Sequence, residues 1–332
     1  RCPAGTGHGP AAMIPPLGGF ALKALTPETV VTVDRSRCVR HRCTANPCTR
    51  CMDVCPTGSV SWGRGGLHID GGACTQCLAC LAVCPTGALA SPDLPLPRLL
   101  SDLAEHPLPV LGCKVQPDTD AHVRLSCLGY LAHPEVMVLC ALVFPDGLHI
   151  NLAACEGCTN GRIADSVAAA HGRLKDLVPG HAVKLIRNRE ELDFQAPSLS
   201  RRQFILYFRE RSTRAAAAMV ERLLDNAEQQ SYGNKQVPAI RALLLKALAA
   251  SPAANSRTIG DQLFGKITFT SDCVRSKRCV GVCPTGAIQA ADAGGNLPVI
   301  DQTLCVSCNS CQAFCRNRGV LISGNYQTVC SE

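Results

Sequence analysis

The cysteines are the residues of this sequence whose type and spacing point to chemistry. The chain has 332 residues, and 23 of them are cysteines. In a small secreted protein so many cysteines would indicate disulfides, but most of these stand in short CxxC and CxxxCP runs, which are typical of metal ligands. We therefore expect metal-bound thiolates in a reducing compartment, the cytoplasm.

The run CTQCLACLAVCP at residues 74–85 is the most complete of these motifs. In CxxCxxCxxxCP the first three cysteines bind one iron–sulfur cluster, and the fourth, which the proline directs away, binds the neighbouring cluster. Zinc ribbons use pairs of CxxC that are separated by longer loops, so interleaved triplets favour iron–sulfur clusters over zinc.

The partner run, CVRHRCTANPCTRCMDVCP at 38–56, has Ala45 where the first cysteine should stand. Cys38 and Cys43 are the two candidates for that place. An aspartate precedes Cys38 by four positions, as it does Cys74 and Cys305, so we choose Cys38 and keep Cys43 as an alternate. The residues between Cys38 and Cys48 are then an inserted loop. The expected 4Fe-4S ligand sets are Cys38, Cys48, Cys51 and Cys84, and Cys55, Cys74, Cys77 and Cys80.

A second pair of runs lies near the C-terminus. One ligand set is complete and predicts a third 4Fe-4S cluster: Cys283, Cys305, Cys308 and Cys311. The other consists of Cys273, Cys279 and Cys315, with Ser276 at the second position and Arg316 in place of the usual proline. Serine binds iron only as an alkoxide, so the iron at that corner would be held weakly. The alternatives are a 3Fe-4S cluster, a 4Fe-4S cluster with a substitute ligand such as Ser276, Cys330 or solvent, and an empty site.

A short phrase is repeated before three of the runs, as VDRSRC at 33–38, IDGGAC at 69–74 and VIDQTLC at 299–305. The runs that end in CP are followed by β-prone pieces, namely GSVSW, GALAS and GAIQA. This order predicts a repeated unit of strand, cluster loop, short helix and strand. Residues 38–90 and 267–324 resemble the bacterial-type ferredoxin modules of polyferredoxin electron-transfer subunits. The resemblance implies a βαββαβ fold and one-electron transfer.

Between these modules, the strand-like segments 108–115, 122–131 and 148–158 alternate with helical segments 133–144 and 160–177, which predicts a small parallel α/β domain. Four cysteines follow the strands and should meet at the carboxyl edge of the sheet: Cys113, Cys127, Cys155 and Cys158. The segments VRLSCLGYL and INLAACEGC are similar to the 2Fe-2S delta subunit of methyl-viologen-reducing hydrogenases. We expect a 2Fe-2S or 4Fe-4S cluster here, with zinc or a redox-active Cys155–Cys158 dithiol as alternatives. Cys140 is expected to be a core residue.

The predicted fold class is α+β, with two ferredoxin-like double-cluster modules flanking the parallel α/β domain and a helical segment. Residues 201–250 are expected to form two amphipathic helices. The domain boundaries that we expect are 1–37 for an N-terminal extension, 38–92 for the first module, 93–196 for the α/β domain, 197–262 for a helical connector and 263–332 for the second module with its tail.

Several other classes of function are not favoured by the sequence. The formal charge of +7 is offset when clusters bind as thiolate complexes of roughly −2 each. Only 4% of the residues are aromatic, so nucleic-acid binding is not expected. The longest apolar run, Val136–Phe144, is shorter than the roughly 20 residues that span a bilayer. Neither a nucleotide-binding loop nor a catalytic histidine pattern is present.

The sequence therefore predicts an electron-transfer subunit with about five clusters. Its expected partners are a catalytic redox subunit and an electron carrier protein, in a hetero-oligomer. One alternative is an oxidoreductase that binds its substrate at an open-coordination cluster. Another is a redox-sensing iron–sulfur scaffold.

Overall fold

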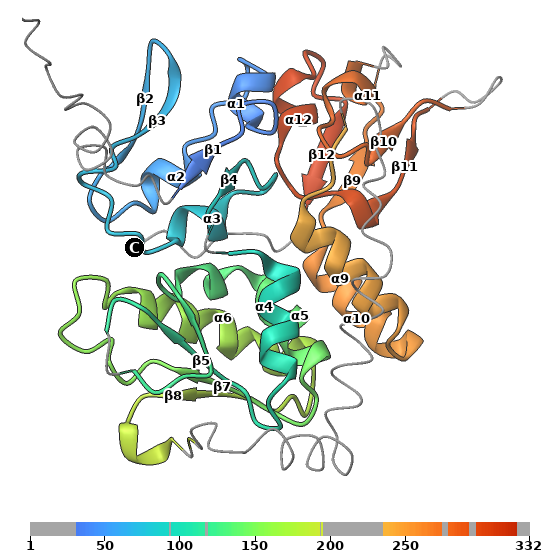
Figure 1. Cartoon of the computed structure of the whole chain (residues 1–332). Helices are drawn as coiled ribbons and strands as arrows, with labels where there is room; N and C mark the ends of the chain where they lie inside the picture. Colours follow the sequence, from blue (N-terminus) through green and yellow to red (C-terminus); the bar gives the residue numbers. More distant parts are fainter. Residues whose placement is uncertain are drawn as a thin grey trace, which may run out of the picture.

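The computed structural model describes residues 31–92, 94–116, 119–192, 194, 235–273, 278–291 and 297–323. Most of the N-terminal extension, the first helix expected within 201–230, Ser276 and Cys330 lie outside the described residues. Helices and strands are mixed throughout, and a four-stranded parallel sheet lies beneath the first ferredoxin-like segment (Figure 1). The predicted α+β class and the parallel sheet are thus confirmed.

The first ferredoxin-like segment contains two small antiparallel pairs of strands. β1 pairs with β4, and β2 forms a hairpin with β3. The cysteine loops and three short helices lie between these strands. In chain order the elements are β1 (Thr32–Val33), α1 (Val39–Arg42), α2 (Arg50–Asp53), β2 (Val60–Gly63), β3 (Gly66–Ile69), α3 (Ala79–Val83) and β4 (Leu89–Ala90).

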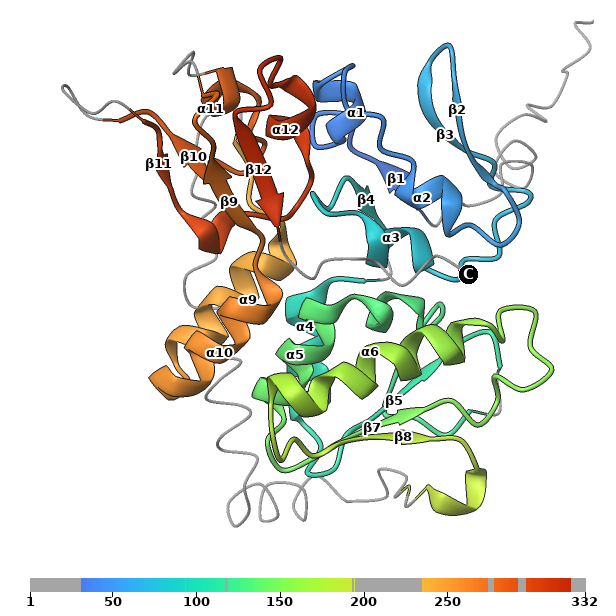
Figure 2. The ribbon, with the colours of Figure 1, turned by 180° about the vertical axis from the view of Figure 1, so that it is seen from behind.

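The C-terminal segment repeats this pairing. β9 pairs with β12, and β10 pairs with β11. As in the first segment, the first strand of the segment pairs with the last, and the two middle strands pair with each other. The elements are β9 (Lys266–Phe269), α11 (Arg278–Val282), β10 (Ile288–Gln289), β11 (Val299–Ile300), η3 (Gln302–Leu304), α12 (Ser310–Phe314) and β12 (Val320–Ser323). The two segments lie side by side, as opposite views show (Figures 1 and 2).

The repeated aspartate makes the same turn in each copy of the phrase. The Oδ1 atoms of Asp34, Asp70 and Asp301 accept a hydrogen bond from the backbone N–H two residues on, at 2.9, 2.9 and 3.0 Å. This Asx turn leads the chain into the cysteine loop. The backbone N–H of each aspartate donates to a carbonyl four residues after a CP cysteine, that of Ala88, Ser59 or Ala287. The repeat therefore fastens each loop to the end of the other half.

A fourth copy of this turn precedes Cys273, and in it Thr270 takes the place of the aspartate. Its Oγ1 accepts from the N–H of Asp272 at 3.2 Å, and its own N–H donates to the carbonyl of Gly319 at 3.1 Å. Thr270 stands three positions before Cys273 rather than four. This copy is therefore one residue shorter, in the same loop that carries Ser276 in the sequence.

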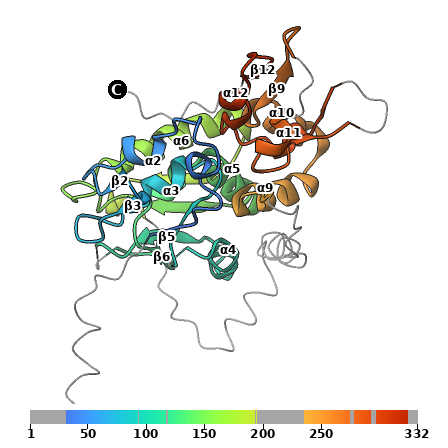
Figure 3. The same cartoon turned by 90° about the horizontal axis from the view of Figure 1, so that it is seen from above.

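The parallel sheet has the strand order β6-β5-β7-β8. α6 covers the face that is turned toward the viewer in Figure 2, and α4 lies on the opposite side, as the view from above shows (Figure 3). The elements are α4 (Leu96–Ala104), β5 (Val110–Cys113), β6 (Val123–Leu125), η1 (Gly129–Ala132), α5 (Pro134–Val143), β7 (Leu148–Asn151), α6 (Ile163–Leu177), β8 (Val183–Ile186) and η2 (Arg189–Glu191).

Two helices connect the sheet to the C-terminal segment. α9 (Ala239–Ala249) corresponds to the expected amphipathic helix and packs on α5. α10 (Ala253–Leu263) begins after Pro252 as a separate helix that was not predicted. α5 is buried on almost every side, because α6, α9 and η1 all pack against it.

One continuous apolar core links the first ferredoxin-like segment, the sheet and both connector helices. The C-terminal segment has a smaller core of its own. No helix in the described parts of the chain is long and apolar enough to span a membrane.

Candidate metal centres

The structure brings together the first group of predicted ligands, Cys38, Cys48, Cys51 and Cys84. Burial and the charges of Cys84, Cys48 and Cys38 together raise the pKa of Cys51 to about 12. Cys38 follows the turn of Asp34, whereas Cys51 lies on α2. Cys43, the alternate, is 4% exposed at the end of α1 and is not among the main causes of the raised pKa of Cys48 or Cys51.

The second group, Cys55, Cys74, Cys77 and Cys80, lines one pocket. Burial raises the pKa of Cys80, and the charges of Cys77, Cys51, Cys74 and Cys55 act in the same direction. Cys51 belongs to the first group, so the two groups are neighbours. Among the described residues, no three His, Cys, Asp or Glu side chains are arranged to hold a single metal ion. A cluster distributes its ligands over several iron atoms, so they need not converge on one point.

The threonine two residues after each CP cysteine contacts the cysteine sulfur. The Sγ to Oγ1 distances are 3.7 Å for Cys55–Thr57, 3.9 Å for Cys84–Thr86 and 3.7 Å for Cys283–Thr285. Sequence reasoning missed these hydroxyls, although the motif CPTG occurs three times. Cys315 is followed instead by Arg316 and Asn317, so the last group lacks this contact.

At Cys55 a second hydroxyl, that of Ser59, also contacts the cysteine sulfur. Burial alone would raise the pKa of Cys55, but hydrogen bonds from Ser59, Val60 and Thr57 lower it to about 7. Ser59 Oγ lies 3.2 Å from the sulfur. Such donors favour the thiolate, which is the form that binds iron.

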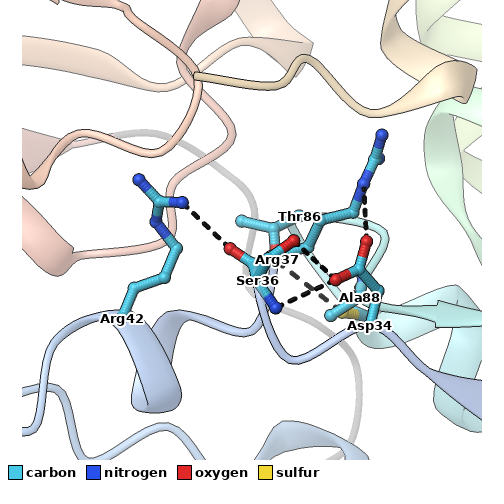
Figure 4. A network of polar contacts seen from close by, with 7 residues as sticks. Asp34, Ser36, Arg37, Arg42, Thr86 and Ala88 are labelled. Carbon is cyan, nitrogen blue, oxygen red and sulfur yellow. Dashed lines mark hydrogen bonds and ion pairs between the residues drawn. The ribbon is translucent and has the colours of Figure 1, made fainter. Parts of the chain in front are cut away.

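Figure 4 shows how the loop of the first group is fastened to the strand that follows Cys84. Asp34 accepts from the N–H and the hydroxyl of Ser36, and its N–H donates to Ala88. The hydroxyl of Ser36 lowers the pKa of Asp34, although burial opposes the shift. The N–H of Ala88 donates in turn to Cys84 Sγ at 3.2 Å. The loop and the sulfur are therefore positioned by one network.

The two complete CxxCxxC loops share an unusual backbone. The residues before and after the second cysteine have positive φ, at Gln76 (57°) and Leu78 (62°) in one loop and at Ser307 (49°) and Asn309 (60°) in the other. Side chains avoid this region, and each such residue costs on the order of 1–3 kcal/mol. Left-handed residues in such loops gather backbone N–H groups into a concave nest that binds anions, including iron–sulfur clusters.

The C-terminal segment brings together the complete set Cys283, Cys305, Cys308 and Cys311. Burial raises the pKa of Cys308 to about 11, and the charges of Cys283 and Cys305 raise it as well. The last group is also assembled, since the charges of Cys273 and Cys315 raise the pKa of Cys279 in addition to burial. The fourth corner of that group, at Ser276, lies outside the described residues.

The four central cysteines follow parallel strands, as expected. Cys113 ends β5, Cys127 follows β6, and Cys155 and Cys158 follow β7. Burial, together with the charges of Cys113 and Cys158, raises the pKa of Cys155 to about 11. Burial also raises the pKa of Cys127, which is about 12 although the N–H groups of Gly129 and Leu128 lower it. Cys140 lies in the apolar core of α5.

The central group lies against the second group of the ferredoxin-like segment. The charge of Cys77 also raises the pKa of Cys127. Asn160 joins the two loops, because its N–H donates to Cys158 Sγ at 3.4 Å and its Nδ2 donates to the carbonyl of Thr75 at 3.0 Å. No local pattern in the sequence marks this junction.

Gly129 permits this close approach, and replacing it should loosen the junction. A Cβ at Gly129 would lie 2.0 Å from the carbonyl oxygen of Cys77, so backbone would have to move. We expect Gly129→Ala to destabilise the protein by about 1–3 kcal/mol. Gly172→Ala on α6 is the control, because a Cβ there meets nothing within 4 Å and the helix should gain about 0.5–1 kcal/mol. Urea unfolding of the anaerobic protein would measure both, and equal effects would contradict the close approach.

Buried donors without partners also fit a bound cluster. Arg50 Nη1 and Ser307 Oγ have no hydrogen-bond partner among the described residues, although both atoms are buried. Each residue adjoins predicted ligands, Arg50 beside Cys51 and Ser307 beside Cys308. Buried donors normally find an acceptor, and cluster sulfur is one. With the nests and the lined pocket, these donors suit iron–sulfur clusters.

Comparison with known proteins agrees with this geometry over part of the chain. Residues 42–89 match the profile of the 4Fe-4S dicluster domain. This match includes Cys43 and omits Cys38, although the charge of Cys38 raises the pKa of both Cys48 and Cys51.

Among curated proteins, ferredoxin-like proteins in the nif region of Trichormus variabilis and Trichormus azollae are each 51% identical to this chain over 41 residues. The aligned part is 12% of this chain and 34% of each relative, so the chain spans about a third of their length. No solved structure gave a significant match, and a similarity to the hydrogenase delta subunit is not shown. The matches support a ferredoxin-like 4Fe-4S module with an iron–sulfur electron-transfer role.

Proposed function

We propose that this chain relays single electrons through five clusters, between a catalytic redox subunit and an electron carrier protein. The observation that carries the proposal is that the cysteine groups form a continuous series. Each cluster, when bound, takes up and releases one electron without making or breaking a bond to substrate. The chain supplies the thiolates, the N–H and hydroxyl donors that set potentials, and the spacing.

The series runs from the central group to the last group. The charge of Cys77 in the second group raises the pKa of Cys127 in the central group. In the same way, the charge of Cys51 in the first group raises the pKa of Cys80 in the second. Asn46 and Arg50, beside the first group, hydrogen-bond to the loop that holds Cys305 and Cys308. α11 and α12 then pack together in the segment that carries the third and last groups. Each group therefore has a neighbour on the way through the protein.

The proposed cluster types follow the ligand sets. The three complete ferredoxin-type sets each suit a 4Fe-4S cluster. The group of Cys273, Cys279 and Cys315 suits a 3Fe-4S cluster or a 4Fe-4S cluster with a substitute ligand. The central group suits a 2Fe-2S or 4Fe-4S cluster. The two ends of the series would face different partners in a cytoplasmic hetero-oligomer.

The test combines iron analysis with a pair of cysteine variants. The anaerobic protein should contain iron and sulfide for five clusters, and electron paramagnetic resonance should resolve them. Cys38→Ala should lose the iron and the signal of one cluster, because it removes a thiolate of the first group. Cys43→Ala should retain both, because Cys43 lies in the buried end of α1.

Iron for only two clusters per chain would contradict the five-cluster series. Loss of a cluster in Cys43→Ala, with all clusters retained in Cys38→Ala, would assign the first position to Cys43. An oxidised-state 3Fe-4S signal that disappears in Cys279→Ala would place that cluster in the last group.

A further inference from the structure

The two ferredoxin-like segments meet at the loop inserted between Cys38 and Cys48. Asn46 in this loop is 3% exposed. Its Nδ2 donates to the carbonyl of Cys308 at 2.9 Å and to Ser310 Oγ at 3.0 Å. Its Oδ1 accepts from the N–H of Cys48 at 3.1 Å. One buried side chain therefore hydrogen-bonds to a predicted ligand residue of each segment.

A second contact crosses the same boundary. Arg50 Nη2 donates to the carbonyl of Ser307 at 3.0 Å. Arg50 directly precedes Cys51, and Ser307 directly precedes Cys308. The loops of the first and third groups are thus held together by neighbouring hydrogen bonds that are buried or partly buried.

We propose that Asn46 is the contact through which electrons cross between the two ferredoxin-like segments. This inference rests on the proposed function. Electron tunnelling weakens less along covalent and hydrogen bonds than across a gap, and Cys48 N–H, Asn46 and the Cys308 carbonyl form such a path with two hydrogen bonds. With clusters bound at both groups, the first group's cluster would lose one electron and become oxidised, and the third group's cluster would gain that electron and become reduced. No bond breaks and no proton moves.

Asn46 is a positioning residue in this proposal, because it binds ligand residues and holds no cluster itself. The inserted loop departs from the usual cysteine spacing at Ala45, and the neighbouring Asn46 makes the bridge. The insertion therefore has a role that the ligand spacing alone does not explain.

Asn151 provides a matched control elsewhere in the chain. It is 4% exposed, its Nδ2 donates to the carbonyl of Asp120 at 2.9 Å, and its Oδ1 accepts from the N–H of Ala153 at 3.0 Å. Asn46→Leu and Asn151→Leu each exchange a buried amide for an apolar group of the same shape. Asn46→Leu loses three side-chain hydrogen bonds and Asn151→Leu loses two, and only Asn46→Leu breaks the path between the segments.

The experiment uses the anaerobic full-length protein. It is reduced with less than one electron equivalent of dithionite, and freeze-quench electron paramagnetic resonance follows each reduced cluster with time. Cys51→Ala and Cys311→Ala assign the signals of the first and third groups. We expect the electron to equilibrate between these two clusters severalfold more slowly in Asn46→Leu than in wild type, and at the wild-type rate in Asn151→Leu.

Iron content and midpoint potentials are measured in the same samples. A slower rate in Asn46→Leu with iron and potentials like those of Asn151→Leu would support the proposal, since a purely structural role would not change the rate alone. Equal rates in wild type and Asn46→Leu would overturn it while leaving the proposed function intact. A wild-type protein without cluster signals would overturn both.

Discussion

Glu135→Gln should destabilise the protein by about 3–5 kcal/mol, because it leaves a buried arginine without its counter-charge. Arg241 on α9 and Glu135 on α5 have side chains that are 1% and 3% exposed. The guanidinium binds both carboxylate oxygens, with Nη2–Oε1 at 2.7 Å and Nε–Oε2 at 3.0 Å. Burial alone would raise the pKa of Glu135, but the charge and hydrogen bonds of Arg241 lower it. The pair is therefore ionised in the folded protein.

The same arginine connects the connector helix to the C-terminal segment. Its Nη1 donates to the carbonyls of Thr303 at 2.6 Å and Cys305 at 2.8 Å, and its guanidinium carbon lies 4.3 Å from the ring centre of Phe264. In Glu135→Gln the buried guanidinium of Arg241 keeps these contacts but has no carboxylate to balance its positive charge. The loss should appear as faster hydrogen exchange in α5 and α9, which measures local opening free energies.

Two further variants separate charge from packing. The double variant Glu135→Leu/Arg241→Met should recover much of the stability, because it removes both charges. It also leaves the carbonyls of Thr303 and Cys305 without their donor, which should cost about 1–3 kcal/mol. Asp261→Asn is the control for an exposed ion pair. Lys266 Nζ lies 3.8 Å from Asp261 Oδ1, and the two side chains are 54% and 66% exposed. Such exposed pairs contribute about 0–1 kcal/mol to stability. Equal losses in Glu135→Gln and Asp261→Asn would contradict the structural role of the buried pair.

The grouping of the cysteines could be predicted because the interleaving rule is local. Each CP cysteine is expected to join the partner run. The charges that act on Cys51 come from its own expected group, whereas those that act on Cys80 come from its own group and from Cys51 of the neighbouring one. The convergence of Cys113, Cys127 and Cys155 followed from strands that all run in one direction. Their role as ligands stays a prediction, as do the cluster types.

The contacts between segments could not be predicted in the same way. Asn46 bonds to a residue 262 positions away, and Arg241 to one 106 positions away, so no local periodicity marks either partner. Arg241 lies in an amphipathic helix, where an arginine ordinarily faces solvent. Gly129 follows Cys127 by two residues, and only the approach of the Cys77 loop explains why a side chain is excluded there.

Removal of iron should unfold the C-terminal segment while the parallel sheet remains folded. Where the structure describes this segment, its small core has eight buried residues, and three of them are Cys283, Cys305 and Cys311. Its helices α11 and α12 have five residues each, whereas isolated helices shorter than about 12–15 residues are marginal. Two-stranded sheets are marginal as well. Cluster binding must therefore supply much of the folding free energy of this segment.

The parallel sheet is the internal control for that experiment, because its core is built mainly from aliphatic side chains on regular strands and longer helices. Leu111, Leu148, Ile150 and Val167 are fully buried around β5, β7 and α6. Hydrogen exchange of the anaerobic protein before and after chelation should show lost protection in β9, β12 and α12 and retained protection in β7 and α6. Iron and sulfide should restore it. Unchanged protection of β9 and β12 in the iron-free protein would mean that the fold of this segment stands without its clusters, and that the cysteines are not needed to hold it together.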